Sequence, residues 1–66
     1  MDINLLRSKM ALHGDTQSTL AEALNIAPQT LCIKLSQEYD FKQSEISIIA
    51  KRYNLTSDEI KQIFFN

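Results

Sequence analysis

Apolar residues recur along this chain at spacings of three and four positions, which is the period of one face of an α-helix rather than of a strand. Together with the capping and turn residues between them, these runs predict five short helices. The first is expected to run from a cap at Asp2 or Asn4 to about Leu12 and to end at a left-handed Gly14. Glycine and proline occur only once each, which also favours an all-helical fold.

The stretch TQSTLAEALNIAPQTLCIKL, residues 16–35, predicts two short helices joined by a tight turn. Thr16 can cap the first, and Asn25 suits a left-handed turn residue because asparagine tolerates positive φ. Pro28 suits the first position of the second helix, where its missing N–H would have no partner. This layout is typical of a helix-turn-helix, whose second helix can enter a DNA groove. The apolar residues that pack the two helices together are expected to be Leu20, Ala21, Leu24, Ile26, Leu31 and Leu35.

The rest of the chain, residues 36–66, predicts a loop and two more helices. Residues 36–41 are polar apart from Tyr39 and Phe41, which are expected to attach this loop to the core. A fourth helix is expected over about residues 42–53, and Asn54 can end it. Its apolar face would consist of Ile46, Ile49, Ala50 and Tyr53, with Ile48 near the border.

The fifth helix follows the capping-box sequence at residues 56–59 and carries more apolar residues than a small core needs. Two interpretations remain open. In the first, Ile60 and Phe64 belong to the core and Phe65 lies at a frayed end. In the second, Ile63 forms a dimer seam with Phe64 or Phe65.

Length and composition limit the class of protein. A chain of 66 residues allows one domain, residues 1–66, with one small core. An apolar content of 44% predicts a folded rather than a disordered chain. Because so small a core typically supplies only a few kcal/mol, association with a second copy is expected.

The reactive residues do not form a recognisable catalytic or metal site. Cys32 is the single cysteine, so it has no disulfide partner and no second thiol with which to bind a metal beside His13. There is no paired-carboxylate cleft, nucleophile–base pair or phosphate loop, so neither an enzyme nor a cofactor-binding protein is expected. A reduced thiol, no apolar run of about 20 residues and no signal peptide indicate a cytoplasmic protein that does not enter membranes.

The charge distribution argues against binding nucleic acid through a basic field alone. The net charge is −1. Residues 1–37 carry three acids and three bases, and residues 38–66 carry five acids and four bases. Binding to DNA would therefore depend on the placement of a few cations.

The order of these elements resembles the helix-turn-helix proteins of the phage Cro and lysogeny-repressor superfamily, also called the Xre family. The similarity is specific at Thr16-Gln17, Leu20-Ala21, Leu24, Ile26, Gln29-Thr30 and Leu31. The tail QSEISIIAKRYNLTSDEIKQIF is also similar to the last two helices of small phage regulators of this group. The resemblance implies a lambda-repressor-like domain that binds operator DNA as a two-fold dimer and regulates transcription in a bacterial host.

The resemblance also implies roles for individual residues. Gln17 matches the glutamine that opens the second helix, where it touches the phosphate backbone and can brace a side chain of the third. Gln29 and Ile33 match base-reading positions. A glutamine amide can pair with adenine, and Ile33 offers apolar contact best suited to a thymine methyl group. Thr30 could meet a phosphate or a thymine methyl.

Four cations are candidates for phosphate contact. The resemblance implies this role for Lys34 and Lys42, and less directly for Arg7 or Lys9. Lys34 stands where the motif usually has a buried aliphatic residue, and Leu35 takes that burial one position later.

A different partner is also consistent with the sequence. Pro28, Cys32 and Ile33 make the outward face of the third helix unusually apolar for a DNA reader. Ala27 moreover lacks a hydroxyl for phosphate. The alternative is an antirepressor of the same fold, which would dock this face on a phage repressor and block its DNA binding.

Overall fold

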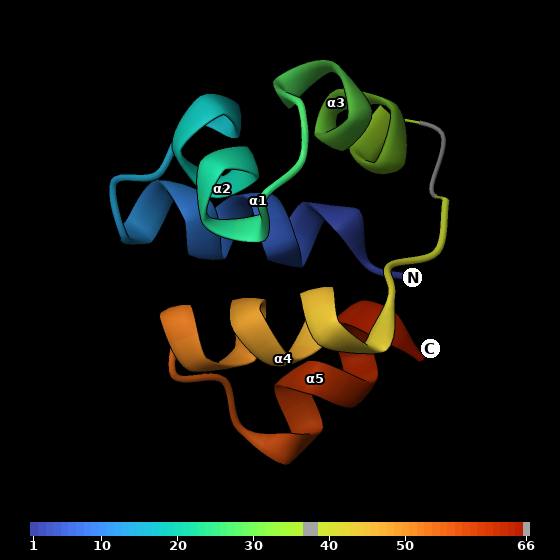
Figure 1. Ribbon diagram of the computed structural model, residues 1–66. Coiled ribbons are helices and arrows are strands. Elements are labelled where there is room, and N and C mark those ends of the chain that lie inside the picture. The colour runs from blue at the N-terminus through green and yellow to red at the C-terminus, as the bar shows by residue number, and fades with distance from the viewer. Residues whose placement is uncertain (37–38, 66) are drawn as a thin grey trace.

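The computed structural model describes residues 1–36 and 39–65, and within them the chain forms five α-helices (Figure 1). They are α1 (Ile3–Leu12), α2 (Gln17–Leu24), α3 (Pro28–Ser36), α4 (Gln43–Arg52) and α5 (Ser57–Phe64). The all-α fold with five short helices is confirmed. Residues 37–38 of the predicted loop lie outside the described residues.

Side-chain caps open α2 and α5, as the sequence predicts. The Thr16 hydroxyl accepts a hydrogen bond from the Thr19 N–H at 3.2 Å, and the Thr19 hydroxyl accepts one from the Thr16 N–H at 2.8 Å. Thr56 and Glu59 make the same reciprocal pair at 3.2 and 2.9 Å. Each pair satisfies two amides that would otherwise have no partner in the helix.

Three helices end in the same way. Gly14, Asn25 and Asn54 have φ values of 71°, 58° and 52°, in the left-handed region. The amide that follows each of them donates to a carbonyl five residues back, at 2.8, 3.0 and 2.9 Å respectively. This is the Schellman pattern, which satisfies helix-end carbonyls and turns the chain. The predicted end residues are therefore confirmed.

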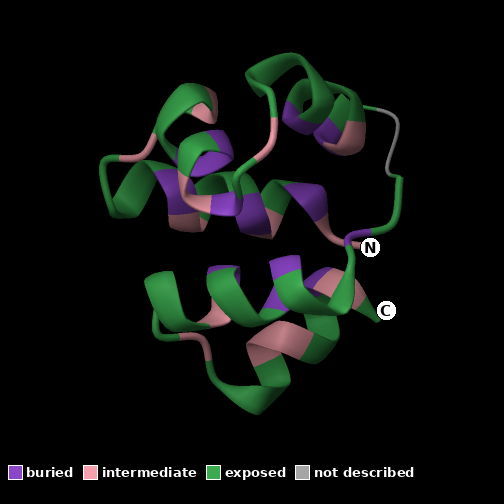
Figure 2. Cartoon of the chain, in the orientation of Figure 1, coloured by how far each residue is buried: buried purple, intermediate pink, exposed green. Residues whose placement is uncertain are grey.

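The core lies between two layers, with α1, α2 and α3 on one side and α4 and α5 on the other (Figures 1 and 2). α2 packs against α3 and α4, and α5 packs against α1 and α4. The buried apolar residues are Ile3, Leu6, Met10, Leu20, Ala21, Leu24, Leu31, Leu35, Phe41, Ile46, Ile49, Tyr53 and Ile63.

Two predictions for apolar residues are wrong. Ile63 is fully buried, so it is a core residue and is not available to a dimer seam. Tyr39 was expected to attach the loop to the core, but it is 56% exposed. Of these two aromatic residues, Phe41 is the one with that role, because its buried ring lies edge-on to Phe64 at 5.6 Å. The hydrophobic pattern locates the α5 stripe but does not identify its innermost residue.

Polar contacts join the first helix to the last. The Asp2 N–H donates to the Ile63 carbonyl at 2.9 Å, and the Asp2 carboxylate accepts from the Gln62 amide at 3.2 Å. Lys9 forms an ion pair with Glu59. The hydrogen bond from Lys9 is the main reason that the pKa of Glu59 lies below its usual value. These contacts hold both chain ends on one side of the molecule (Figure 1).

Asp15 is the centre of a polar cluster that joins α2 to α4. Its carboxylate accepts two hydrogen bonds from Arg52, at 2.6 and 2.7 Å. It also accepts one from the Tyr53 hydroxyl at 2.6 Å and one from Thr19 at 2.9 Å. The Arg52 hydrogen bonds, aided by those from Tyr53 and Thr19, hold the pKa of Asp15 well below its usual range. Burial and the Asp15 contact raise the pKa of Tyr53, whose ring also stacks on His13.

The Asp15 cluster makes the stability of the fold depend on pH. Because the pKa of Asp15 is lower in the folded chain, its stabilisation is complete above about pH 5 and is lost as the pH falls below about 4. We expect Asp15→Asn to cost about 1–2 kcal/mol at pH 7, since Arg52 is partly open to solvent. Urea unfolding of both proteins from pH 7 to pH 3 should show the difference shrinking in acid. Arg52→Gln is the matched variant and should behave alike, whereas a constant difference down to pH 3 would contradict this account.

Candidate nucleic-acid interface

The helices α2 and α3 form a compact unit joined by residues 25–27. Asn25 turns the chain in its left-handed conformation, and the half-buried Ile26 packs against the core behind the turn. Leu31 and Leu35, one helical turn apart, fix the inner side of α3. The side of α3 opposite Leu31 and Leu35 therefore faces outward, as the sequence predicts.

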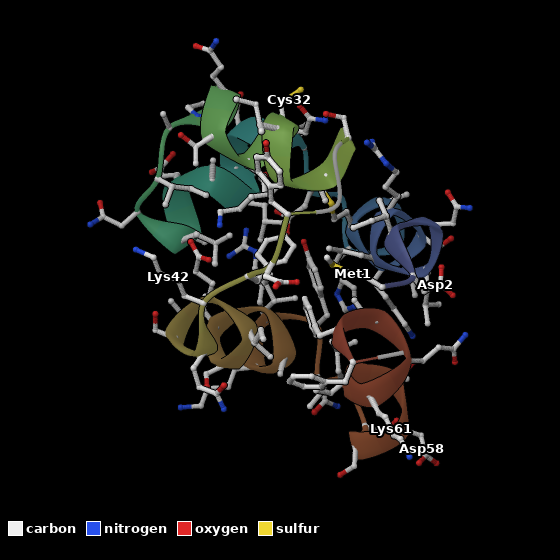
Figure 3. All side chains as sticks on the ribbon, turned by 90° about the vertical axis from the view of Figure 1, so that its right-hand side faces the viewer. Met1, Asp2, Cys32, Lys42, Asp58 and Lys61 are labelled. Atoms are coloured by element: carbon white, nitrogen blue, oxygen red, sulfur yellow. The ribbon has the colours of Figure 1, made fainter. Side chains whose placement is uncertain are left out.

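The outward side of α3 is exposed and uncharged. Figure 3 shows Cys32 at the outer surface of α3, on the side away from α4 and α5. Gln29, Cys32 and Ile33 are spaced three and four residues apart, so they lie on one stripe of the helix surface. Five residues of α3 that were predicted to bind DNA or a protein partner are exposed to solvent, namely Pro28, Gln29, Thr30, Cys32 and Ile33.

Lys34 does not belong to this face, contrary to the prediction that it contacts phosphate. Its side chain is only 14% exposed, and its ammonium donates to the Asp40 carbonyl at 3.1 Å. The same ammonium lies 3.5 Å from the Glu45 carboxylate and 5.5 Å from the centre of the Phe41 ring. These three contacts turn the charge of Lys34 toward the start of α4, so it is not available to a ligand of α3.

Sequence reasoning missed Glu45, which is 4% exposed. Its carboxylate accepts a hydrogen bond from the Lys42 N–H at 2.8 Å, in addition to the ion pair with Lys34. An anion in the first turn of α4 is also favoured by the helix dipole. One signal could have revealed this pair, namely a lysine at a position that usually holds a buried aliphatic residue. A lysine there requires a counter-ion nearby.

The other residues predicted to contact DNA differ in their exposure to solvent. Lys42 is exposed at the start of α4, and Figure 3 shows it on the flank of the molecule below α3. Gln17 is half-buried at the first position of α2. Arg7 is exposed on α1, whereas Lys9 is engaged by Glu59. Lys42 is thus the exposed cation nearest in sequence to the end of α3.

An acidic residue lies beside the turn. Glu22 is exposed on α2 and lines an open hollow of about 490 Å³ together with Asn25, Ile26 and Pro28. This charge disfavours a phosphate at the start of α3, where the helix dipole would otherwise favour one.

A second hollow lies where the chain ends meet, at the predicted dimer seam. Its volume is about 230 Å³, and Phe64 and Phe65 line it together with Met1, Phe41 and Ile46. Phe65 is 63% exposed, whereas Phe64 is half-buried by its contact with Phe41. Phe65 is thus the residue of the predicted seam that stands open to a partner.

The described residues form neither a metal-ligand cluster nor a membrane-spanning helix. No cluster of three or more histidine, cysteine, aspartate or glutamate side chains there could hold a metal ion. Among the described helices, none combines the length and the apolar character that a membrane span requires.

The buried pair predicts coupled effects on stability. Lys34→Met leaves the Glu45 charge without its cation and should cost about 3 kcal/mol of unfolding free energy. The double variant, Lys34→Met with Glu45→Gln, should lose about 1–3 kcal/mol less unfolding free energy than the two single variants lose together. The reason is that the amide that replaces the carboxylate can still accept from the Lys42 N–H. Urea unfolding of the two single variants and the double variant measures these losses. Lys42→Met is the exposed control and should lie within about 0.5 kcal/mol of the wild type. If the loss of unfolding free energy in the double variant equalled the sum of the losses in the two single variants, the pairing of Lys34 with Glu45 would be contradicted.

Comparison with known proteins identifies no relative: no family model, no curated protein and no solved structure matches this chain.

Proposed function

We propose that this protein is a sequence-specific DNA-binding regulator of transcription, of the phage Cro and repressor type. In this proposal α3 lies in the major groove, the protein acts as a dimer on operator DNA, and it represses by occupying a promoter. It has no enzymatic activity and needs no cofactor.

The observation that carries the proposal is the α2–α3 unit. Its turn is closed by a left-handed Asn25, and only one side of α3 is used for packing. A helix held in this way presents a free side to a groove, which is how a helix-turn-helix reads DNA. Gln29 and Thr30 supply exposed hydrogen-bonding groups on that side, and Lys42 supplies a cation at its flank.

The dimer is proposed to form around Phe65. A two-fold arrangement would place two copies of α3 in successive major grooves, roughly 34 Å apart. An isologous contact uses the same patch on both copies, so the exposed Phe65 of each can cover the hollow beside Phe64 of the other.

One observation favours a second candidate function. Because Lys34 is turned inward, the exposed side of α3 has no charge, and Pro28, Cys32 and Ile33 give it an apolar character. Such a surface also suits a protein partner, so an antirepressor that binds a phage repressor is the alternative. Co-elution with a neighbouring repressor, without binding to DNA, would favour this alternative.

DNA binding can be tested on duplexes that the protein selects from a random pool. We expect binding whose logarithm falls linearly with the logarithm of salt concentration, because each phosphate contact releases counterions. In a dimer, Lys42→Gln should reduce the magnitude of that slope by about 2, since one contact is lost from each subunit. Fluorescence anisotropy at several salt concentrations measures the slope. Arg7→Gln tests the other exposed candidate in the same way.

Lys61→Gln is the control for that experiment. It removes one exposed positive charge and should leave the salt slope unchanged, because Figure 3 shows Lys61 at the opposite end of the molecule from Cys32 of α3. If the wild type binds no DNA at low salt, the proposed function is wrong.

Dimer formation can be tested separately by sedimentation equilibrium. Phe65→Ala should weaken association by about 10-fold or more, as expected for an aromatic residue central to an interface. Leu12→Ala is the control, because Leu12 is an apolar residue at the end of α1 that is 76% exposed, which is more than Phe65. If both variants and the wild type had the same dimer dissociation constant, Phe65 would not belong to the interface.

A further inference from the structure

The exposed side of α3 limits which bases it can recognise. All nine residues of α3 are described, and its one charged residue, Lys34, has its ammonium 3.1 Å from the Asp40 carbonyl and 3.5 Å from Glu45. The side chains left on the outward stripe are therefore uncharged. We propose that α3 reads only A·T base pairs, with Gln29 on adenine and Ile33 on a thymine methyl group, and makes no contact with guanine. This inference rests on the proposed function.

The chemistry of the major groove supports this assignment. Guanine presents two acceptors, N7 and O6, and is read mainly by arginine or lysine. Cytosine presents a donor and is read by a carboxylate. With Lys34 turned inward and no acidic residue in α3, the helix offers neither group. Adenine presents an acceptor and a donor that match the two ends of a glutamine amide, and thymine presents a methyl group that suits an apolar side chain.

The spacing of the two readers adds a geometric constraint. Gln29 and Ile33 are four residues apart, so their side chains emerge about 6 Å from each other on the same side of the helix. Bases along one strand are about 3.4 Å apart. The adenine and the thymine methyl group should therefore lie about two base steps from each other. Thr30 is also exposed, and in this proposal it contacts a phosphate or a thymine methyl group and no guanine.

Atom-deletion analogues of the bases test this inference on a duplex selected by the protein from a random pool. Replacing every guanine by 7-deazaguanine should change the affinity by less than about twofold, because no guanine N7 is used. Replacing the contacted adenine by 7-deazaadenine should weaken binding by about 10-fold. Replacing the contacted thymine by uracil removes one methyl group and should weaken binding by about 4-fold.

Protein variants assign each effect to its residue. Gln29→Ala should be insensitive to 7-deazaadenine and still sensitive to uracil, and Ile33→Ala should show the reverse. Both residues are exposed, so neither change is expected to disturb the fold. Lys61→Gln is the control, because Figure 3 places Lys61 on α5, at the opposite end of the molecule from Cys32. This variant should keep both sensitivities.

The outcomes separate this inference from the proposed function. A loss of 10-fold or more with 7-deazaguanine would overturn the A·T reading while leaving DNA binding intact. Gln29→Ala that still responds to 7-deazaadenine would remove Gln29 from the readout. If no duplex is bound at low salt, both the inference and the proposed function fail.

Discussion

The ion pair between Lys34 and Glu45 decides both how α3 is held and what α3 can contact. It joins the last turn of α3 to the first turn of α4, on either side of residues 37–38. Both side chains are largely buried, so each charge requires the other. The Lys42 N–H and the Asp40 carbonyl complete the hydrogen bonding of the pair. A cation that could have strengthened an outer surface is thereby used to fix the orientation of α3.

A second polar cluster does the same for α2. Asp15 receives hydrogen bonds from Arg52 and Tyr53 of the α4 end and from Thr19 of α2. The 13 buried apolar residues in the described part of the chain leave a small margin of stability, and polar contacts such as these supply a large fraction of that margin. The two clusters lie at either end of α4. Together with Leu31 and Leu35 they hold the α2–α3 unit in one orientation on the rest of the fold.

Most of the fold could be predicted because its signals are local. Caps such as Thr16 and Thr56, and left-handed residues such as Asn25, act within a few residues of the chain, and the structure confirms them. Pairs far apart in sequence could not be predicted in this way. Asp15 and Arg52 are 37 positions apart, and nothing in the local pattern links them.

The same distinction between local signals and contacts distant in sequence applies to the residues of the candidate site. The exposure of Gln29 and Ile33 follows from helical periodicity, because Leu31 and Leu35 must face inward. The direction of Lys34 does not follow from periodicity, since it depends on a carboxylate 11 positions further along the sequence. Ile63 and Phe65 are a similar case, because both are apolar residues at the end of α5 and only packing against α1 and α4 separates a buried residue from an exposed one.

The neutral face of α3 has a consequence for specificity in the proposed complex. Sequence-independent affinity comes from phosphate contacts, and here few cations flank α3 while Glu22 lies beside its start. Random DNA would therefore be bound weakly. The discrimination proposed for Gln29 and Ile33 would not depend on charge, so it would survive at salt concentrations that suppress the remaining phosphate contacts. A regulator built in this way gains selectivity by keeping its non-specific binding low, and it needs a second copy to reach useful affinity.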